Sequence, residues 1–534
     1  MITLEKFSGI APGISPYKLS DAMATLANNV RFDRHRLDNW KGMQAIEGVA
    51  ANTASIFPYN GSWLTSTFRR HYVRTIIPND VRERIVFTDS DYPKIRSGAE
   101  EYRLGIPSPS TTAATLEVAG DKSDPLLIEN WSYIISYVDA WGAEGPTSQA
   151  TNTIEVGQGG SVRIVFPTVP TGDYNFGAGA LIRIYRTNTG ATSTEFQYVD
   201  EVAITSADYV DSALGSTLQE VAPSVDWIGP PDDDIATYPD GPLLGLVELP
   251  NGVLAGYSGN SVHFSQPYLP HAWPLKYRKA TSAKIKGLVP IDSGLLVLTE
   301  EHPYLIIGTL PDSMILAPME SDQACVSENG YVDMGGYALY PSPDGLVRAQ
   351  GNTTQIVSSE YFTKEAWQAL TPETFRAFKY DDKYLAFYGD VTDATGFVFD
   401  PRGQAAAFSQ LNLEVNAGYQ DPLTDKLYLA YIDELDVWQL GEFDAGSTLT
   451  FEWQCKIFRY PRPTAFNVIS CKADAYPVDV EVFADGVSQF AITLNDDTPR
   501  KIPGGFKARE WQLKITSSNP VDFVGLFKSM AEAI

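Results

Sequence analysis

Carboxylates are the most numerous side chains in this chain that could do chemistry. Those considered for catalysis are Asp89, Asp91, Asp292, Glu300, Glu301, Asp381 and Asp382. A facing pair of carboxylates could hydrolyse a glycosidic bond, with one acting as acid and the other as nucleophile or base. Asp is also a common turn residue, because its side chain accepts hydrogen bonds from nearby backbone. We interpret these residues as turn residues. A carbohydrate-active or carbohydrate-binding protein is the alternative, since 28 Tyr and 10 Trp could stack on sugars.

Other catalytic and metal-binding patterns do not occur. The five histidines form no HxH or HExxH arrangement, and there is no nucleophile elbow, Walker loop or GxGxxG motif. The run Asp232-Asp233-Asp234 lacks the alternating ligand spacing of a calcium loop, so we interpret it as a solvated linker. Cys325, Cys455 and Cys471 have no CxxC spacing, which predicts buried reduced thiols. We therefore predict a protein that is not an enzyme and holds no cofactor or metal.

A short basic and aromatic cluster lies near the N-terminus. Its members are Arg31, Phe32, Arg34, Arg36, Trp40 and Lys41. Such clusters can grip single-stranded nucleic acid, but Arg and Trp are also favoured anchors of protein interfaces. We predict that this cluster is a protein–protein interface on an N-terminal arm. On this hypothesis, deletion of residues 1–45 leaves the propeller predicted below folded but abolishes its incorporation into a larger assembly, and Trp40→Ala weakens incorporation more than Arg34→Ala does.

The elements expected to carry these residues are β-strands that recur in pairs. Turns open five pairs at Asn251, Asp292, Gly335, Asp382 and Asp425, 41 to 47 residues apart, and Asn60-Gly61 opens a sixth. This spacing matches the ~40 to 50 residues of a β-propeller blade, whose copies bury one another's apolar faces. Helix signals are scarce, and apolar and polar residues alternate between turn residues elsewhere. We predict an all-β protein with a β-propeller of six or more blades.

Breaks in the repeat divide the chain into domains. A Pro/Ser/Thr linker begins at residue 106, and the short strands that follow resemble an immunoglobulin or fibronectin type III sandwich, which should fold autonomously. After residue 446, Val478-Asp479-Val480-Glu481-Val482-Phe483 alternates cleanly, Asp485-Gly486 turns the chain, and Trp453 and Trp511 should anchor a core. The expected domains are an arm (1–50), a first blade (51–105), the inserted sandwich (106–222), the remaining blades (223–446) and a C-terminal antiparallel β domain (447–534).

Charge is distributed unevenly along the chain. The net charge is -26, although residues 1–105 carry 14 Lys and Arg against 11 Asp and Glu. The acidic remainder should not bind nucleic acid tightly, because phosphate contacts need cations. An acidic wall would let DNA pass without sticking, and acidity also keeps a large β protein in solution. We see no signal peptide and no apolar run near the ~18 residues of a membrane span, which predicts synthesis in a cytosol and no membrane span.

Both ends of the chain resemble virion proteins of tailed bacteriophages. The N-terminal similarity rests on Phe7, Gly9, Pro12, Ala24, Ala27, Asn29 and Val30, although the usual Gly-x-Leu-x-Pro turn is replaced at residues 35–39. The C-terminal similarity rests on Pro461, Pro463, Thr464, Phe466, Ala473-Asp474, Pro477-Val478, Ala484-Asp485-Gly486, Pro503-Gly504-Gly505-Phe506, Arg509 and Trp511.

With a propeller between these ends, the chain resembles the tail hub or nozzle (tail tubular) proteins of short-tailed phages. The resemblance implies a structural protein that forms a homo-oligomeric ring, expected to be a hexamer, below the portal. Its implied partners are other copies of itself, the head-to-tail adaptor, other tail proteins, and genomic DNA that passes through the lumen during ejection without specific binding. The implied location is the virion tail, after synthesis in the bacterial host cytoplasm.

Overall fold

The computed structural model describes residues 1–189, 194–390, 395–402 and 408–533. Strands hold 47% of the residues and helices 4%, which confirms the predicted all-β class. The α-helices are single turns, α1 (Lys364–Gln368) and α2 (Met530–Ala533). The chain divides into two compact units. The first comprises residues 1–69, 291–305 and 318–534, and the second comprises residues 70–290 and 306–317.

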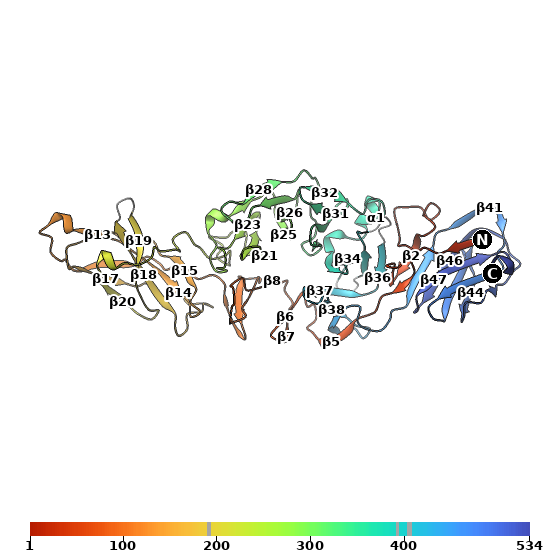
Figure 1. Ribbon diagram of the computed structural model, residues 1–534, viewed down its shortest axis with the longest axis horizontal. Coiled ribbons are helices and arrows are strands. Elements are labelled where there is room, and N and C mark those ends of the chain that lie inside the picture. Colours follow the sequence, from red (N-terminus) through yellow and green to blue (C-terminus); the bar gives the residue numbers. More distant parts are fainter. Residues whose placement is uncertain (190–193, 391–394, 403–407, 534) are drawn as a thin grey trace. The chain divides into compact units, whose positions relative to one another are not determined.

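In the first unit, strands from both ends of the chain form one β domain, called the terminal β domain below (Figure 1). One sheet has the order β1-β47-β42-β45. Its strands are β1 (Ile2–Leu4), β47 (Val521–Phe527), β42 (Val468–Ala473) and β45 (Arg500–Lys501). The other sheet runs β2-β40-β46-β43-β44, and β41 also pairs with β46. Its strands are β2 (Ala24–Asn28), β40 (Phe451–Cys455), β46 (Ala508–Ser517), β43 (Val478–Ala484), β44 (Val487–Leu494) and β41 (Phe458–Thr464).

The core of the terminal β domain contains side chains from both ends of the chain. Trp453 and Trp511 are fully buried there, as predicted, and the ring of Phe7 meets Trp453 edge-on at a centroid distance of 5.0 Å. Ala24 and Ala27 of β2 are buried in the same cluster. Residues 1–50, expected to form an arm, therefore contribute strands to sheets of the first unit, because their apolar side chains complete this core.

Three four-stranded antiparallel arrangements make up much of the rest of the first unit. The first is β29 (Val332–Asp333), β30 (Ala338–Ser342), β31 (Gly345–Gln350) and β32 (Thr353–Ile356). The second is β33 (Arg376–Tyr380), β34 (Lys383–Tyr388), β35 (Thr395–Phe399) and β36 (Phe408–Leu411), and β36 continues into β2. The third is β37 (Glu414–Gln420), β38 (Leu427–Ile432), β39 (Trp438–Glu442) and β5 (Gln44–Gly48). The fourth strand of the third sheet thus comes from the N-terminal segment.

Several predicted turns have the left-handed backbone that Asn-Gly and Asp-Gly pairs favour. At Asn60-Gly61 the φ angles are 49° and 75°, and at Asp485-Gly486 they are 49° and 78°. Two consecutive residues with positive φ define the type I′ hairpin turn. The first of these turns joins β6 (Ser55–Tyr59) to β7 (Ser62–Ser66), a two-stranded sheet in the first unit. Residues 51–105, which were expected to form one blade, therefore do not form a single sheet. They form this hairpin in the first unit and a separate sheet in the second unit.

Two four-stranded antiparallel sheets of the second unit lie outside the segment of residues 106–222. One is β8 (Tyr72–Arg74), β9 (Ile85–Phe87), β10 (Lys94–Ser97) and β11 (Glu100–Arg103). The other is β21 (Leu244–Leu249), β22 (Val253–Ser258), β23 (Ser261–Phe264) and β24 (Lys279–Ala280). Four further strands follow in the chain, namely β25 (Ile285–Ile291), β26 (Gly294–Thr299), β27 (Tyr304–Ile307) and β28 (Ile315–Pro318).

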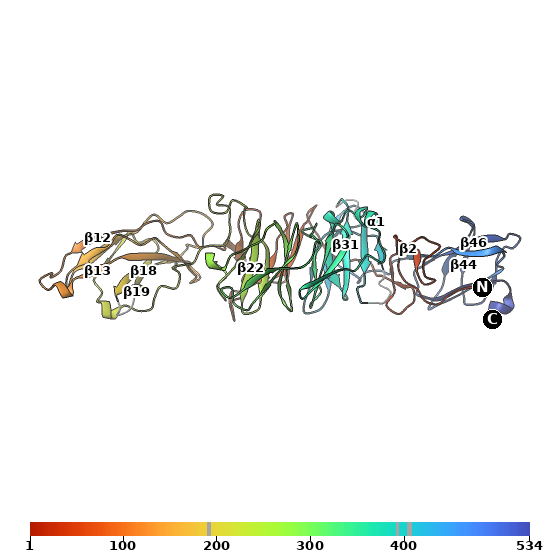
Figure 2. The same ribbon diagram turned by 90° about the horizontal axis from the view of Figure 1, so that it is seen from above.

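The segment expected to be an insertion has strands and a core of its own within the second unit (Figure 2). Its sheets are β12 (Ala113–Val118) with β17 (Ser161–Val165) and β20 (Asp208–Asp211), β13 (Glu129–Trp131) with β16 (Ile154–Val156), and β15 (Glu144–Thr147), β14 (Tyr133–Val138), β18 (Leu181–Thr189) and β19 (Thr194–Ala203). Beyond residue 222, Ser224 Oγ donates a hydrogen bond of 2.9 Å to the buried Glu144. A residue beyond the expected end of the insertion therefore contacts the core of this segment.

Candidate functional site

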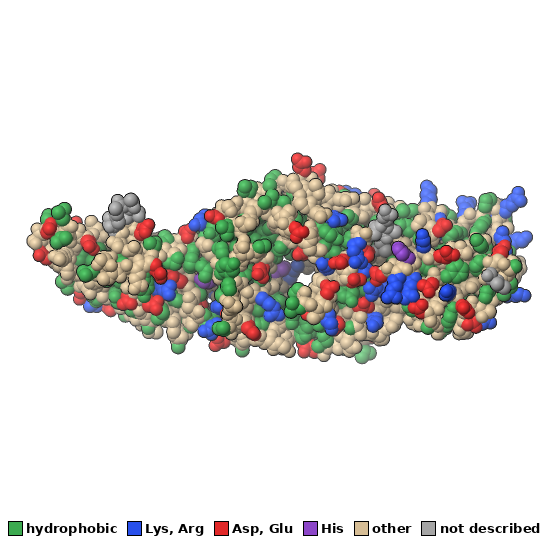
Figure 3. All heavy atoms as spheres, in the orientation of Figure 1, with side chains coloured by type: hydrophobic (Ala, Val, Ile, Leu, Met, Phe, Trp, Pro, Cys, Tyr) green, Lys and Arg blue, Asp and Glu red, His purple; other side chains and the backbone are tan. Residues whose placement is uncertain are grey.

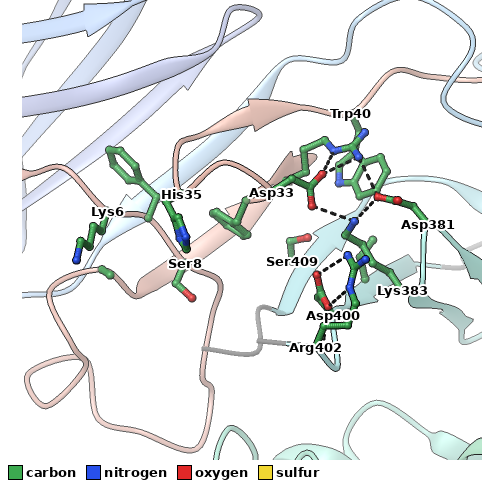
Figure 4. Close-up of a pocket in the computed structure, with 15 residues that line it drawn as sticks. Lys6, Ser8, Asp33, His35, Trp40, Asp381, Lys383, Asp400, Arg402 and Ser409 are labelled. Carbon is green, nitrogen blue, oxygen red and sulfur yellow. Dashed lines mark hydrogen bonds and ion pairs between the residues drawn. The ribbon is translucent and has the colours of Figure 1, made fainter. Parts of the chain in front are cut away.

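A cavity of about 700 Å³ lies in the first unit between the N-terminal segment and sheet β33–β36. The N-terminal segment lines it with Lys6, Phe7, Ser8, Ala22, Arg31, Phe32, Asp33, His35 and Trp40. The sheet and its turns line it with Asp381, Lys383, Val398, Asp400, Arg402 and Ser409. Figure 4 shows Ser8 and His35 on one side of the cavity, facing Ser409, Asp400 and Arg402 on the other.

Two tight turns place the charged residues of this cavity. β3 (Val30–Arg31) and β4 (Asp38–Asn39) form a hairpin, and His35 between them has a φ of 58°. Across the cavity, Asp381 and Asp382 form the turn between β33 and β34, with φ angles of 49° and 53°. His, Asn and Asp tolerate this left-handed conformation better than most other residues do. Local sequence therefore fixes each turn, and packing brings the two turns together.

Four charged side chains from these turns close a ring of ion pairs. Arg31 lies 2.6 Å from Asp33 and 3.3 Å from Asp381. Lys383 lies 2.9 Å from Asp33 and 2.5 Å from Asp381. Arg31 also pairs with Asp444 at 3.0 Å. We call Arg31, Asp33, Asp381 and Lys383 the charge ring. It joins the N-terminal hairpin to sheet β33–β36, and Figure 3 shows basic and acidic side chains side by side on one face of the first unit.

The electrostatics of the charge ring oppose a role for Asp33 as a catalytic acid. Burial by itself raises the pKa of Asp33, but hydrogen bonds and charge from Lys383 and Arg31 outweigh it, and the pKa falls below its usual value. On the sheet side of the cavity, two hydrogen bonds of 3.0 Å hold Arg402 to Asp400, and these raise the pKa of Arg402. A catalytic acid needs a carboxyl group whose pKa is raised towards neutrality. The Asp33 carboxylate is shifted in the opposite direction and behaves as a fixed negative charge.

Other groups lining the cavity lack partners. Ser8 is 5% exposed and Trp40 is 1% exposed, yet Ser8 Oγ and Trp40 Nε1 have no hydrogen-bond partner among the described residues. Lys6 is exposed and makes no ion pair within that part of the chain. An indole N–H and an ammonium group can only donate, and a hydroxyl can donate as well. On its N-terminal side, the lining of the cavity therefore includes hydrogen-bond donors that have no acceptor among the described residues.

The six residues predicted as an interface have different environments in the structure. Trp40 is buried, with the Arg31 guanidinium 4.3 Å from the centre of its ring and Phe443 at 5.5 Å. Arg36 pairs with Asp38 and with Asp474, and Phe32 is half-buried against the core of the terminal β domain. Arg34 and Lys41 are exposed and form no ion pair among the described residues.

The comparison expected between Trp40→Ala and Arg34→Ala therefore has to be revised. Trp40 fixes the hairpin against sheet β33–β36, so Trp40→Ala should act through stability of the fold. Of the two residues in that comparison, only Arg34 has an exposed side chain that could contact another protein.

The other candidate residues lie in structural contacts. Asp89 is buried and pairs with Arg70 at 2.6 Å and Lys94 at 2.9 Å. In the predicted linker, Asp233 pairs with Arg103 at 2.8 Å. In the described part of the chain, no group of three or more His, Cys, Asp or Glu side chains is placed to hold a metal ion. Cys325, Cys455 and Cys471 are buried and form no disulfide among the described residues, as predicted. No helix among the described residues is long and apolar enough to cross a membrane.

We expect Asp33→Asn to lower the free energy of unfolding of the first unit by about 1 to 2 kcal/mol at pH 7. This loss lies between the losses that are typical of exposed and of buried ion pairs. The cause is the loss of one of the two carboxylates that neutralise the buried Lys383. Because folding lowers the pKa of Asp33, the stabilisation is present above the unfolded pKa of ~3.9 and is lost as the pH falls through the folded pKa.

Urea unfolding of both proteins, followed by tryptophan fluorescence at pH 7 and at pH 3, measures this effect. The difference between them should shrink at pH 3. Arg34→Gln is the matched control and should change stability by less than about 0.5 kcal/mol. An equal difference at both pH values would contradict the role given to the Asp33 charge.

Comparisons with known proteins identify no relative from sequence. No protein-family model matches the chain, and no curated protein matches it. Among solved structures, it is similar to PorZ, a bacterial surface component of the type-IX secretion system of Porphyromonas gingivalis, with a TM-score of 0.27 and 12% identity over 59% of this chain and 37% of that one. The chain thus spans little more than a third of PorZ.

Two further solved structures show similarly distant likeness. The N-terminal domain of Nup159 has a TM-score of 0.26 and 11% identity over 64% of this chain and 86% of that one. A eukaryotic initiation factor has a TM-score of 0.24 and 9% identity over 89% of this chain and 94% of that one. Likeness at this level carries no argument about function.

Proposed function

We propose that this chain is a structural protein of a short-tailed bacteriophage tail, a hub or nozzle ring that forms part of the DNA ejection channel. One observation carries the proposal. The two segments that resemble phage virion proteins lie at opposite ends of the sequence, and they meet in one core. Phe7, Ala24 and Ala27 from the N-terminal segment are packed in the same cluster as Phe466 and Trp511. The resemblance therefore concerns one folded domain rather than two separate fragments.

The proposed architecture is a β-propeller with an inserted immunoglobulin-like sandwich. Its support is the recurrence of four-stranded antiparallel sheets whose strands follow one another in the chain, as β29–β32 and β21–β24 do. Each such sheet has apolar faces that a neighbouring sheet can cover. In this architecture the terminal β domain joins the two chain ends to the propeller, and the segment around residues 106–226 is an appendage.

The proposed mechanism is geometric and electrostatic. A ring of chains that each carry a net charge of -26 would present a wall that repels DNA phosphates, so DNA could move through the lumen without specific binding. The implied partners are other copies of the chain, the head-to-tail adaptor and other tail proteins, and the implied location is the virion tail. The alternative, a carbohydrate-active propeller, gains no support from the cavity, where Asp33 and Asp381 are neutralised by Arg31 and Lys383.

The decisive experiment locates the protein in particles. We expect mass spectrometry of purified virions to detect the chain, and gold-labelled antibodies against it to decorate the tail. Incubation of the purified 58.6 kDa chain with polysaccharides should release no reducing sugar. Absence of the chain from tails, together with saccharide hydrolysis that one carboxylate substitution abolishes, would replace this proposal with the carbohydrate alternative.

A further inference from the structure

The cavity beside the charge ring is suited to an acidic ligand that also carries an apolar group. Its lining includes Lys6, Arg31, Lys383 and Arg402 against Asp33, Asp381 and Asp400, an excess of one positive charge in a chain of net charge -26. Lys6 is the exposed cation of this lining and forms no ion pair in the described part of the chain, whereas the carboxylates of the charge ring already have cationic partners. Phe32, which is only half-buried, adds apolar surface to this lining.

The first unit carries an exposed turn with the complementary chemistry. Residues 433–437 connect β38 to β39 and read Asp-Glu-Leu-Asp-Val. Leu435 is 81% exposed and Val437 is 46% exposed. Glu434 and Asp436 are exposed and make no ion pair in the described part of the chain. The turn thus offers two carboxylates without an ion pair among the described residues, one on either side of a largely exposed leucine.

Hydrogen bonds hold this turn in a single shape. The Asp433 side chain accepts from the backbone N–H of Leu435 at 2.9 Å and of Val437 at 3.0 Å. The Asp436 N–H also donates to the Asp433 carbonyl at 3.0 Å. A preformed turn loses little conformational entropy when it binds, which favours its use as a recognition element.

The turn does not fill the cavity of its own copy. Asp433 and Glu434 border a different groove of about 500 Å³, which is also lined by Met43, Glu414 and Leu449. The two sets of lining residues have no member in common. A turn that reaches the cavity must therefore come from another molecule.

We infer that the cavity of one copy receives the 433–437 turn of a second copy, with Leu435 against Phe32, and with Glu434 and Asp436 near Lys6. This inference rests on the proposed ring function and names its subunit contact. The cavity and the turn are different surfaces of one chain, so the contact is head-to-tail and can close into a ring. Its volume of about 700 Å³ lies within the usual range for sites that enclose a ligand.

Sedimentation velocity and mass photometry of the full-length chain test this contact. We expect wild type to self-associate, and we expect Lys6→Glu and Glu434→Lys each to raise the dissociation constant at least about tenfold, as loss of a charge pair at an interface does. Both substitutions in one chain should restore association to within about threefold of wild type, because the pair re-forms between copies with its signs exchanged. Lys18→Glu, which changes another exposed and unpaired lysine of the N-terminal segment, is the matched control and should associate as wild type does.

A mixing experiment tests the head-to-tail geometry. Lys6→Glu chains have a damaged cavity and an intact turn, and Leu435→Asp chains have the reverse. In an equimolar mixture, the intact turn of a Lys6→Glu chain can enter the intact cavity of a Leu435→Asp chain. No second contact of this kind can form, so association should stop at two copies. Both substitutions are at exposed side chains, and unchanged circular dichroism and thermal unfolding will show that the variants are folded.

The remaining outcomes overturn the inference. They are a monomeric wild type, single variants that associate as Lys18→Glu does, a doubly substituted chain that stays dissociated, or mixtures that form rings. The tail role fails by a different result, absence of the chain from purified tails, so the two proposals can fail separately.

Discussion

Deletion of residues 1–45 should leave the terminal β domain unable to fold. The deletion removes β1, which pairs with β47, and β2, which lies between β36 and β40 in one sheet. It also removes the buried side chains Ile2, Leu4, Phe7, Ala24, Ala27 and Val30 from one core. Burial of each larger apolar side chain contributes about 1.5 to 3 kcal/mol, so the combined loss is comparable to the ~5 to 15 kcal/mol that stabilises a whole domain.

Limited proteolysis and hydrogen exchange on the chain of residues 46–534 measure this effect. We expect rapid exchange and early cleavage across residues 451–527. A matched truncation after Lys528 removes the exposed turn α2 and should leave the domain intact. A native exchange pattern in the 46–534 chain would restore the interpretation of the N-terminal residues as a detachable arm.

The N-terminal segment shows where prediction from sequence ends. β43 was predictable because its apolar residues alternate, and its burial in the structure alternates in the same way. β1 is three residues long, which is too short for alternation to be recognised. It is a strand because β47, more than 500 residues away, provides the partner and the core. No local pattern encodes such a pairing, so the segment was interpreted as an arm.

The candidate site was only partly predictable for the same reason. The sequence indicates the cluster around Arg31 and Trp40, but it gives Asp381 only as a turn residue and does not single out Lys383. Each half of the charge ring is a pair of opposite charges two residues apart, Arg31 with Asp33 and Asp381 with Lys383. That spacing could be recognised in the sequence as a local charge pair. It does not reveal that the two pairs contact each other, because they are 350 residues apart in the chain. Two of the four cations of this cluster, Arg31 and Arg36, are therefore neutralised in the fold, whereas Arg34 and Lys41 stay exposed.

The buried ion pair of the inserted segment should have the largest effect of any single substitution considered for this protein. Arg186 and Asp211 are almost completely buried, and Arg186 Nη1 lies 2.7 Å from Asp211 Oδ2. Tyr133 donates to the same carboxylate at 2.8 Å, and the guanidinium lies 3.8 Å from the centre of the Trp131 ring. Arg186 Nε and Nη2 have no hydrogen-bond partner among the described residues. The carboxylate of Asp211 is therefore the main compensation for a buried positive charge.

We expect Asp211→Ala to lower the free energy of unfolding of this segment by about 3 to 5 kcal/mol, because it leaves a buried charge unpaired. The sample is the fragment of residues 106–226. It keeps the packing of Ala222 against Ile134 and Tyr185 and the hydrogen bond from Ser224 to Glu144, and it should unfold cooperatively by itself.

Asp208→Ala on the same strand removes an exposed partner of Arg163 and should lower the free energy of unfolding by at most about 1 kcal/mol. Replacing both buried partners, as Arg186→Met with Asp211→Leu, should recover much of the loss, since no charge then remains in the core. Equal losses for Asp211→Ala and Asp208→Ala in urea unfolding would show that the buried pair does not stabilise the segment, and a fragment without a cooperative transition would show that its boundaries are wrong.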